Sequence, residues 1–146
     1  MNKIARPLYD ADPHAWYEEQ ASLLRDGRLD DLDAAHLIEE LEDLGRSERD
    51  RLFSSLRLIL THLLKWRHQP ERRTRSWTVT IERERVNVDV WLTRSPSLKS
   101  RLPSEYAQAW RAARRDAAVE TGLPPPAFPE DCPFTLEQAL EPGWLP

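Results

Sequence analysis

The stretch Leu52–Pro70, LFSSLRLILTHLLKWRHQP, decides the fold of this chain. Its large apolar side chains recur at steps of three and four residues; they are Leu52, Phe53, Leu56, Ile59, Leu60, Leu63, Leu64 and Trp66. This spacing predicts an amphipathic helix whose apolar face is wide enough to contact several neighbouring helices. Pro70 ends the helix, because proline cannot donate to the helical ladder and disfavours the α region in the preceding residue. We expect this helix to be the centre of an all-α bundle.

The composition restricts the class of protein. The chain has 146 residues, 40% of them apolar and 32% charged, which suits one soluble globular domain with a single core. No apolar run reaches the length of a membrane span, and the N-terminal residues contain no apolar stretch typical of a secretory signal. The single cysteine, Cys132, cannot form an internal disulfide, which fits a reducing compartment. We therefore expect a cytoplasmic protein without membrane contact.

Helix start and stop signals divide the chain into about five helices. The signals are Asp12-Pro13, Asp26-Gly27, Asp33, Pro70, Thr74 or Ser76, Ser95-Pro96, Pro103 and Gly122. They predict a single helical domain over residues 1–146, with an N-terminal lead (1–11), a helical bundle (12–122) and a Pro-rich tail (123–146). Thr135 is the expected cap of one short helix in the tail, from Leu136 to Leu140. Aromatic residues in the tail predict that it wraps the core of the bundle.

Gly45 leaves two alternatives for the helix that begins near Asp33. The following Ser47-x-x-Asp50 resembles a capping box, so we favour a break at Gly45 that makes a helical hairpin. A continuous helix is the alternative, since a glycine inside a helix costs only about 1 kcal/mol. Before Gly45, the residues expected to face inward are Leu37, Ile38, Leu41 and Leu44.

The segment 77–94 fits two periodicities. Val86, Val88 and Val90 alternate as in a strand, and their β-branched side chains agree with that assignment. Trp77, Ile81 and Val88 nevertheless lie on one helical stripe, and no turn residue divides the segment into a hairpin. We therefore predict a helix.

Several short motifs occur in an order that resembles one bacterial family. They are Leu8-Tyr9-Asp10 with Ala15-Trp16, Leu44-Gly45-Arg46-Ser47-Glu48, His62-Leu63-Leu64-Lys65-Trp66, Gln69-Pro70-Glu71-Arg72, Ser95-Pro96-Ser97-Leu98 and Glu120-Thr121-Gly122-Leu123-Pro124. Over roughly residues 8–146 the chain is similar to the family called domain of unknown function 29, common in cyanobacteria and proteobacteria. The resemblance implies an all-helical fold, which supports the helix over 77–94, and it implies no activity. The valine-rich Val86–Val90 and the basic Arg67-His68 depart from the family's pattern.

Asp33, His36 and Glu40 are the weak candidates for a metal site. Their spacing of three and four residues lets the side chains meet on one helix face. A di-metal site in a helical bundle, however, needs a Glu-x-x-His pair from each of two helices and further glutamates. We therefore assign no metal, cofactor or catalytic residue, and favour a histidine held by hydrogen bonds.

His62 lies between apolar residues of the central helix, so we expect it to be half-buried. In the hairpin that a break at Gly45 would form, Asp30 or Asp31 becomes the carboxylate partner of His62. Such a pair is able to act as an acid–base unit. More often it only satisfies a half-buried imidazole, and we favour that interpretation.

The connector over residues 65–77 interleaves tryptophans with cations. These cations are Lys65, Arg67, Arg72, Arg73 and Arg75, which with His62 form the candidate functional surface. Such a composition can bind phosphates and stack on bases. The acidic balance of the chain, with a net charge of -4, argues against a dedicated nucleic-acid domain. We favour an internal role for these cations, opposite the acidic stretch 30–43.

Three hypotheses follow, in order of preference. The first is a non-enzymatic helical module that binds a protein partner or a second copy of itself, which gel filtration with light scattering tests. The second is a nucleic-acid-associated protein that uses the connector, whose binding would weaken steeply with salt. The third is a metal-assisted enzyme around Asp33, His36 and Glu40, which elemental analysis tests. No nucleophile motif or phosphate-binding loop occurs in the sequence.

Overall fold

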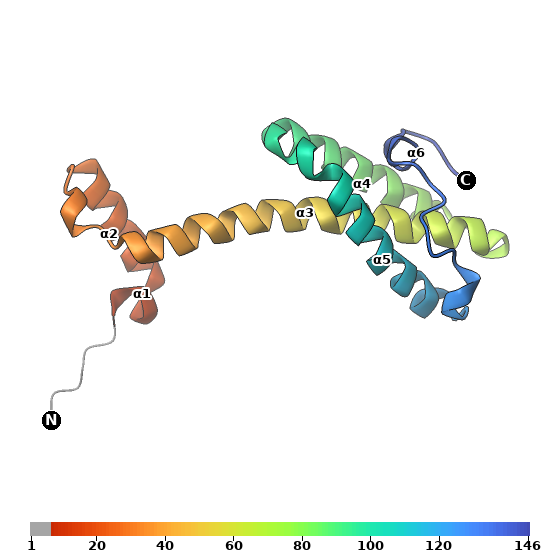
Figure 1. Cartoon of the computed structure of the whole chain (residues 1–146), viewed down its shortest axis with the longest axis horizontal. Helices are drawn as coiled ribbons and strands as arrows, with labels where there is room; N and C mark the ends of the chain where they lie inside the picture. Colours follow the sequence, from red (N-terminus) through yellow and green to blue (C-terminus); the bar gives the residue numbers. More distant parts are fainter. Residues whose placement is uncertain (1–6) are drawn as a thin grey trace, which may run out of the picture. The chain divides into compact units, whose positions relative to one another are not determined.

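The computed structural model describes residues 7–146, so the part of the predicted lead over 1–6 lies outside the described range. Every regular element within residues 7–146 is helical, which confirms the all-α class, and Figure 1 shows their order along the chain. The α-helices are α1 (Leu8–Ala11), α2 (Pro13–Arg25), α3 (Ala34–His68), α4 (Arg75–Arg94), α5 (Leu102–Thr121) and α6 (Leu136–Leu140). Short 3-10 turns connect them. No helix in this range combines the length and apolarity that crossing a bilayer requires.

The chain divides into two compact units at the boundary between Arg46 and Ser47. Unit 1 is the part up to Arg46, and unit 2 runs from Ser47 to Pro146. The helix α3 belongs to both, because it continues from Ala34 to His68 through the boundary. The expected break at Gly45 is therefore wrong. No positive φ is required of Gly45, and the Ser47-x-x-Asp50 pattern lies within an uninterrupted helix.

The core of unit 2 forms around the C-terminal half of α3, as the opening stretch predicts. Leu52, Leu56, Ile59 and Leu63 are completely buried. The other buried members of this cluster are Leu60, Leu64, Ile81, Val88, Leu98, Ala109, Trp110, Ala113, Ala117, Phe128, Phe134 and Ala139. They come from α3, α4, α5, the 3-10 turn between α4 and α5, and the tail; the helices and the tail lie together in Figure 1. The predicted centre of the bundle is confirmed.

The helix α4 runs antiparallel to α3 within unit 2. Polar contacts mark the pairing: Ser55 Oγ donates to the buried Glu84 at 2.9 Å, and Arg94 lies 3.4 Å from Glu48. Val88 points into the core, whereas Val86 and Val90 are exposed. The alternating valines thus belong to a helix, as predicted for the segment 77–94.

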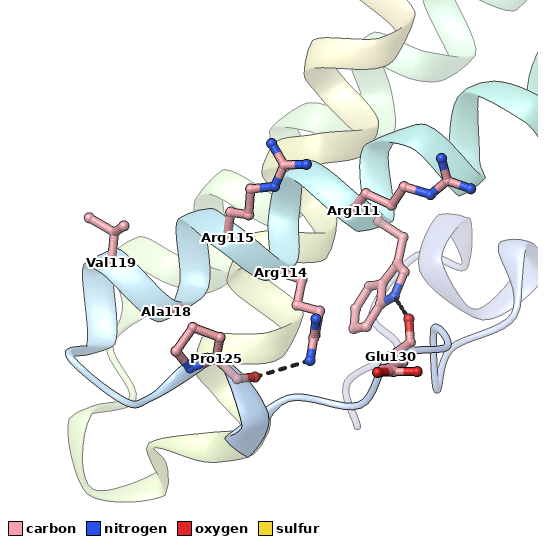
Figure 2. Close-up of a pocket in the computed structure, with 8 residues that line it drawn as sticks. Arg111, Arg114, Arg115, Ala118, Val119, Pro125 and Glu130 are labelled. Carbon is pink, nitrogen blue, oxygen red and sulfur yellow. Dashed lines mark hydrogen bonds between the residues drawn. The ribbon is translucent and has the colours of Figure 1, made fainter.

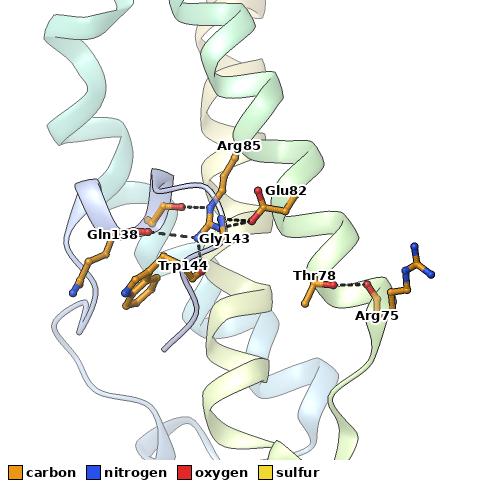
Figure 3. A network of polar contacts seen from close by, with 8 residues as sticks. Arg75, Thr78, Glu82, Arg85, Gln138, Gly143 and Trp144 are labelled. Atoms are coloured by element: carbon orange, nitrogen blue, oxygen red, sulfur yellow. Dashed lines mark hydrogen bonds and ion pairs between the residues drawn. The ribbon is translucent and has the colours of Figure 1, made fainter.

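The C-terminal part of the tail is bound to α4 through Arg85, whose side chain is almost completely buried. Arg85 donates to three backbone carbonyls of the tail: Ala139 O at 2.8 Å, Trp144 O at 2.8 Å and Gln138 O at 3.4 Å (Figure 3). Glu82 pairs with the same guanidinium at 2.6 Å and also accepts the N–H of Gly143. The short helix α6 has the predicted bounds and the predicted Thr135 cap. The tail therefore wraps the core, as expected.

Unit 1 consists of α1, α2 and the first part of α3, and it buries few apolar side chains. Trp16 and Leu23 are its buried apolar residues among those described. Ile38, Leu41 and Leu44 are 56%, 67% and 63% exposed, so the inward face expected before Gly45 is wrong for these three residues. Contacts from α1 and α2 instead reach the adjacent face of α3, which carries polar side chains. The single domain expected over residues 1–146 stays a prediction.

Candidate functional site

The Asp33 side chain is the centre of a polar cluster in unit 1. One carboxylate oxygen accepts Trp16 Nε1–H at 3.1 Å and lies 2.7 Å from His36 Nδ1. The other accepts the backbone N–H of His36 at 3.4 Å, as a helix cap does. The backbone N–H of Asp33 donates to the buried Gln20 side chain at 2.8 Å. This one residue therefore starts α3 and joins it to α2.

The Glu40 carboxylate binds two tyrosine hydroxyls, not the imidazole of His36. Tyr9 donates to one oxygen at 2.7 Å, and Tyr17 donates to the other at 3.2 Å. The Tyr9 ring also stacks on His36, with ring centroids 3.9 Å apart. Across the described part of the chain, no three His, Cys, Asp or Glu side chains stand together in a way that could hold a metal ion. Asp33, His36 and Glu40 thus lie in one cluster, in which each carboxylate has its own partners.

Hydrogen bonds within this cluster shift the protonation of its members. The bond between Asp33 and His36 lowers the pKa of the carboxyl and raises the pKa of the imidazole. The hydrogen bond to Glu40 raises the pKa of Tyr9 to about 12. With Nδ1 held by Asp33, the atom of His36 left for an outside proton is Nε2. The contacts of the cluster nevertheless all connect α1, α2 and α3, so its clearest effect is to hold unit 1 together.

His62 has a different partner from the one predicted. Its Nδ1 lies 2.8 Å from the backbone carbonyl of Leu58, one turn earlier in α3. Burial lowers the pKa of His62. Asp31 in turn pairs with Arg28 at 2.9 Å. The pairing of His62 with Asp30 or Asp31 required a hairpin at Gly45, and the continuous α3 removes it.

Three cations of the connector contact unit 2 itself. Lys65, only 14% exposed, lies 3.1 Å from Glu120 and 4.7 Å from the centre of the Trp77 ring. Arg73 lies 4.8 Å from the centre of the Trp66 ring and donates to the Trp66 carbonyl at 2.9 Å. The guanidinium of Arg67 is 5.9 Å from the centre of the Phe134 ring. Each half-buried tryptophan of the connector therefore already has a cation of the same unit over its ring.

Arg72 and Arg75 remain exposed at the surface of unit 2. Among residues 7–146, no carboxylate lies within ion-pair distance of Arg72, Arg73 or Arg75. The acidic stretch 30–43 belongs to unit 1, so its pairing with these arginines stays a prediction. Within unit 2, Arg73 contacts Trp66.

A pocket of about 400 Å³ opens between α5 and the loop that follows it (Figure 2). Its cationic residues are Arg111, Arg114 and Arg115, and its one acidic residue among those described is Glu130. Its apolar residues are Trp110, Ala118, Val119 and Pro125. We call it the α5 pocket. The sequence contained one signal for it, three arginines at positions i, i+3 and i+4 of the alanine-rich helix, which our interpretation of α5 did not use.

Two internal contacts hold the walls of the α5 pocket in place. Arg114 donates to the Phe128 carbonyl at 3.0 Å and to the Pro125 carbonyl at 3.2 Å. Trp110 Nε1–H donates to the Glu130 carbonyl at 2.8 Å. The loop over 125–130 is therefore bound to α5 at both ends of the pocket.

The fold defines an all-helical protein built around one long central helix. Over residues 8–145 the chain matches the family described as domain of unknown function DUF29, and it belongs to that family. No curated protein and no solved structure matches the chain. The family assignment confirms the resemblance seen in the sequence motifs.

Proposed function

We propose that this protein is a helical interaction module that associates with a second copy of itself through α3. The observation that carries the proposal is the α3 stripe, formed by Ile38, Leu41 and Leu44, each more than half exposed. On a helix, residues spaced three apart lie on one side, so the three side chains form a continuous apolar strip. Exposed apolar patches of this kind mark surfaces that are covered by a partner.

The charges beside the α3 stripe support a second copy as that partner. Four carboxylates come first along the helix; they are Glu39, Glu40, Glu42 and Asp43. In the stretch that follows, the three arginines Arg46, Arg49 and Arg51 outnumber the two carboxylates Glu48 and Asp50 by one. When two such helices pair antiparallel about a twofold axis, the acidic part of each faces this weakly basic stretch of the other. Glu42 and Arg49 flank one side of the stripe.

The midpoint between Glu42 and Arg49 lies next to Gly45. An added Cβ at Gly45 would meet no atom within 4 Å, so this side of the helix is open to a close neighbour. Helix pairs approach to 8–10 Å between axes depending on the side chains at the contact, and glycine permits the close end of that range. The apolar strip, the charge order and the glycine thus agree on one antiparallel arrangement.

Gel filtration with light scattering over a concentration series tests the proposal. The wild type should approach the mass of a dimer as the concentration rises, whereas Leu41→Glu should stay at the mass of a monomer, because it places a charge in the strip. Val86→Glu is the matched control, since Val86 is 61% exposed on α4 and should leave association unchanged. A wild type that stays monomeric at every concentration would contradict the proposal.

A charge exchange tests the antiparallel register. Glu42→Arg should weaken association, because it places like charges opposite each other in both symmetric contacts. The double variant Glu42→Arg with Arg49→Glu should restore it, since the pair is inverted but still opposite in sign. If the double variant is weaker than the single one, the proposed register is wrong.

The connector offers less support for nucleic-acid binding than its composition suggested. Lys65 and Arg73 are engaged with Trp77 and Trp66, so one face of each indole is already covered. Arg72 and Arg75 are the exposed cations that remain beside them. We therefore keep association through the α3 stripe as the proposed function.

A further inference from the structure

We propose that the α5 pocket binds a small organic anion with an apolar body, such as a carboxylate or phosphate group attached to a hydrocarbon chain. The site lies within unit 2 and does not depend on association through α3. Its volume, about 400 Å³, is in the range of small-molecule pockets, which runs from about 300 to 1,000 Å³.

The charge of the pocket favours an anionic ligand. Three arginines and one glutamate line it, so the local balance is positive in a protein whose net charge is negative. Arginine presents several N–H donors in a planar fork that matches the oxygens of a carboxylate or phosphate. The charge and the donor geometry both favour an anionic oxygen group.

The three arginines of the pocket differ in the contacts that they already make. Arg114 uses its guanidinium to hold the Phe128 and Pro125 carbonyls, so it shapes the wall. Arg111 and Arg115 are one turn apart on the exposed side of α5, and in Figure 2 both side chains extend from α5 away from Pro125 and Glu130. Across residues 7–146, neither has a carboxylate within ion-pair distance. Arg111 and Arg115 are therefore the two arginines that are free to bind an anion at the rim of the pocket.

The pocket also has an apolar lining. Val119 is 83% exposed, an unusual position for a large aliphatic side chain in an otherwise polar helix surface. Together with Ala118, Pro125 and the edge of Trp110, it gives the pocket an apolar wall next to the two arginines. An inorganic anion would use only the arginines, whereas a ligand with a hydrocarbon body would also cover this wall.

Internal hydrogen bonds already hold the walls of the pocket in place. Trp110 and Arg114 are fixed by hydrogen bonds to Glu130, Phe128 and Pro125, so the ligand would not have to order the loop. A preformed site retains more of the interaction free energy as affinity. Glu130 is the one feature that opposes an anion, since its carboxylate would repel it.

Isothermal titration calorimetry of the full chain with four probes tests the proposal. The probes are octanoate and octyl phosphate, which carry both features, octanol, which lacks the charge, and inorganic phosphate, which lacks the apolar body. At least one of the first two should bind roughly tenfold or more tightly than octanol and inorganic phosphate, the factor expected from losing one charge-assisted interaction. Preference between octanoate and octyl phosphate identifies the anionic group. Equal binding of octanol, or no binding of either amphipathic probe, would overturn the proposal.

Three variants connect the binding to the α5 pocket. The double variant Arg111→Gln with Arg115→Gln should weaken binding of the preferred probe by roughly tenfold or more, because both anion donors are lost. Glu130→Gln should tighten binding, because it removes the repelling charge from the pocket. Arg72→Gln with Arg75→Gln is the matched control: it changes the net charge by the same amount outside the pocket and should leave affinity almost unchanged.

Both arginine pairs are exposed, so the variants should keep the melting temperature of the wild type, which circular dichroism checks. If the two double variants lose affinity equally, the probe responds to overall charge and the assigned site is wrong. A Glu130→Gln variant that binds more weakly than the wild type would also overturn it.

Discussion

Each of the two units is stabilised internally by a different kind of contact, although one helix runs through both. In unit 2, α3 contributes completely buried side chains such as Leu56, Ile59 and Leu63 to an apolar cluster. In unit 1, Asp33, just before this helix, and Glu40 within it form hydrogen bonds with α2 and α1, and Leu41 and Leu44 face outward. An apolar stripe on a helix therefore predicts a face that is buried in a contact. It does not tell whether another part of the chain or a second molecule makes that contact.

This difference has an energetic consequence. Burying a large aliphatic side chain stabilises a fold by about 1.5–3 kcal/mol, whereas a typical hydrogen bond contributes about 0.5–1.5 kcal/mol net. Unit 1 has few of the former and several of the latter. We expect unit 1 to open locally at a lower free energy than unit 2.

The largest expected effect contrasts two leucines on α3. Leu63→Ala should lower the free energy of unfolding by about 2–5 kcal/mol, since it leaves a cavity in the core of unit 2. Leu41→Ala, at a residue that is 67% exposed, should change it by less than about 0.5 kcal/mol in the monomer. Urea denaturation at low protein concentration measures both. Similar losses would show that the contrast between the units is wrong.

A smaller effect is expected at the glycine beside the boundary between the units. Gly45→Ala should stabilise the monomer by up to about 1 kcal/mol, because Gly45 lies inside a continuous helix and an added Cβ meets nothing within 4 Å. Gly122→Ala is the control and should be destabilising by about 1–2 kcal/mol, since Gly122 ends α5 at φ 73°. Thermal unfolding distinguishes the two. A loss of stability in Gly45→Ala would favour a helix broken at that position.

The connector should show a still smaller contrast. Arg73→Gln should cost about 0.5–1 kcal/mol, because its guanidinium lies over the Trp66 ring. Arg72→Gln and Arg75→Gln should each be close to neutral, as for exposed cations without an ion-pair partner. Denaturation in low and high salt measures these differences. Equal losses at all three positions would show that the contact with Trp66 does not set Arg73 apart from Arg72 and Arg75.

The weakest effect should be the pH dependence of unit 1, because the Asp33–His36 pair is about one-third exposed and solvent screens it. The raised pKa of His36 means that its contribution is complete at low pH and is lost as pH rises through the folded-state pKa. The lowered pKa of Asp33 means that its contribution is lost as pH falls through the folded-state value. The protection factors of the amides in α2, which correct for the intrinsic pH dependence of exchange, should therefore be largest between these two values. His36→Gln should remove the loss on the alkaline side, and an unchanged profile would contradict the assignment.

The sequence was sufficient for most of the local structure. The ends of α2 at Asp12-Pro13 and Asp26-Gly27, the end of α3 before Pro70 and the Thr135 cap of α6 were all predicted, because each depends on a few neighbouring residues. The helix over the alternating valines was also predicted, since Trp77, Ile81 and Val88 share one helical stripe. Membership of the family followed from the order of short motifs.

Tertiary structure decided the features that depend on residues distant in sequence. At Gly45 the local signals for a break were opposed only by a modest helix cost, so the neighbouring sequence was not enough to tell a hairpin from one helix. Which face of α3 receives α1 and α2 depended on Tyr9, Trp16 and Tyr17 finding Glu40 and Asp33. The α5 pocket likewise required the loop over 125–130 to fold back onto α5. Caps and periodicity are properties of a few adjacent residues, whereas a packing partner is chosen by competition among all faces of the chain, and this is why only the structure determined it.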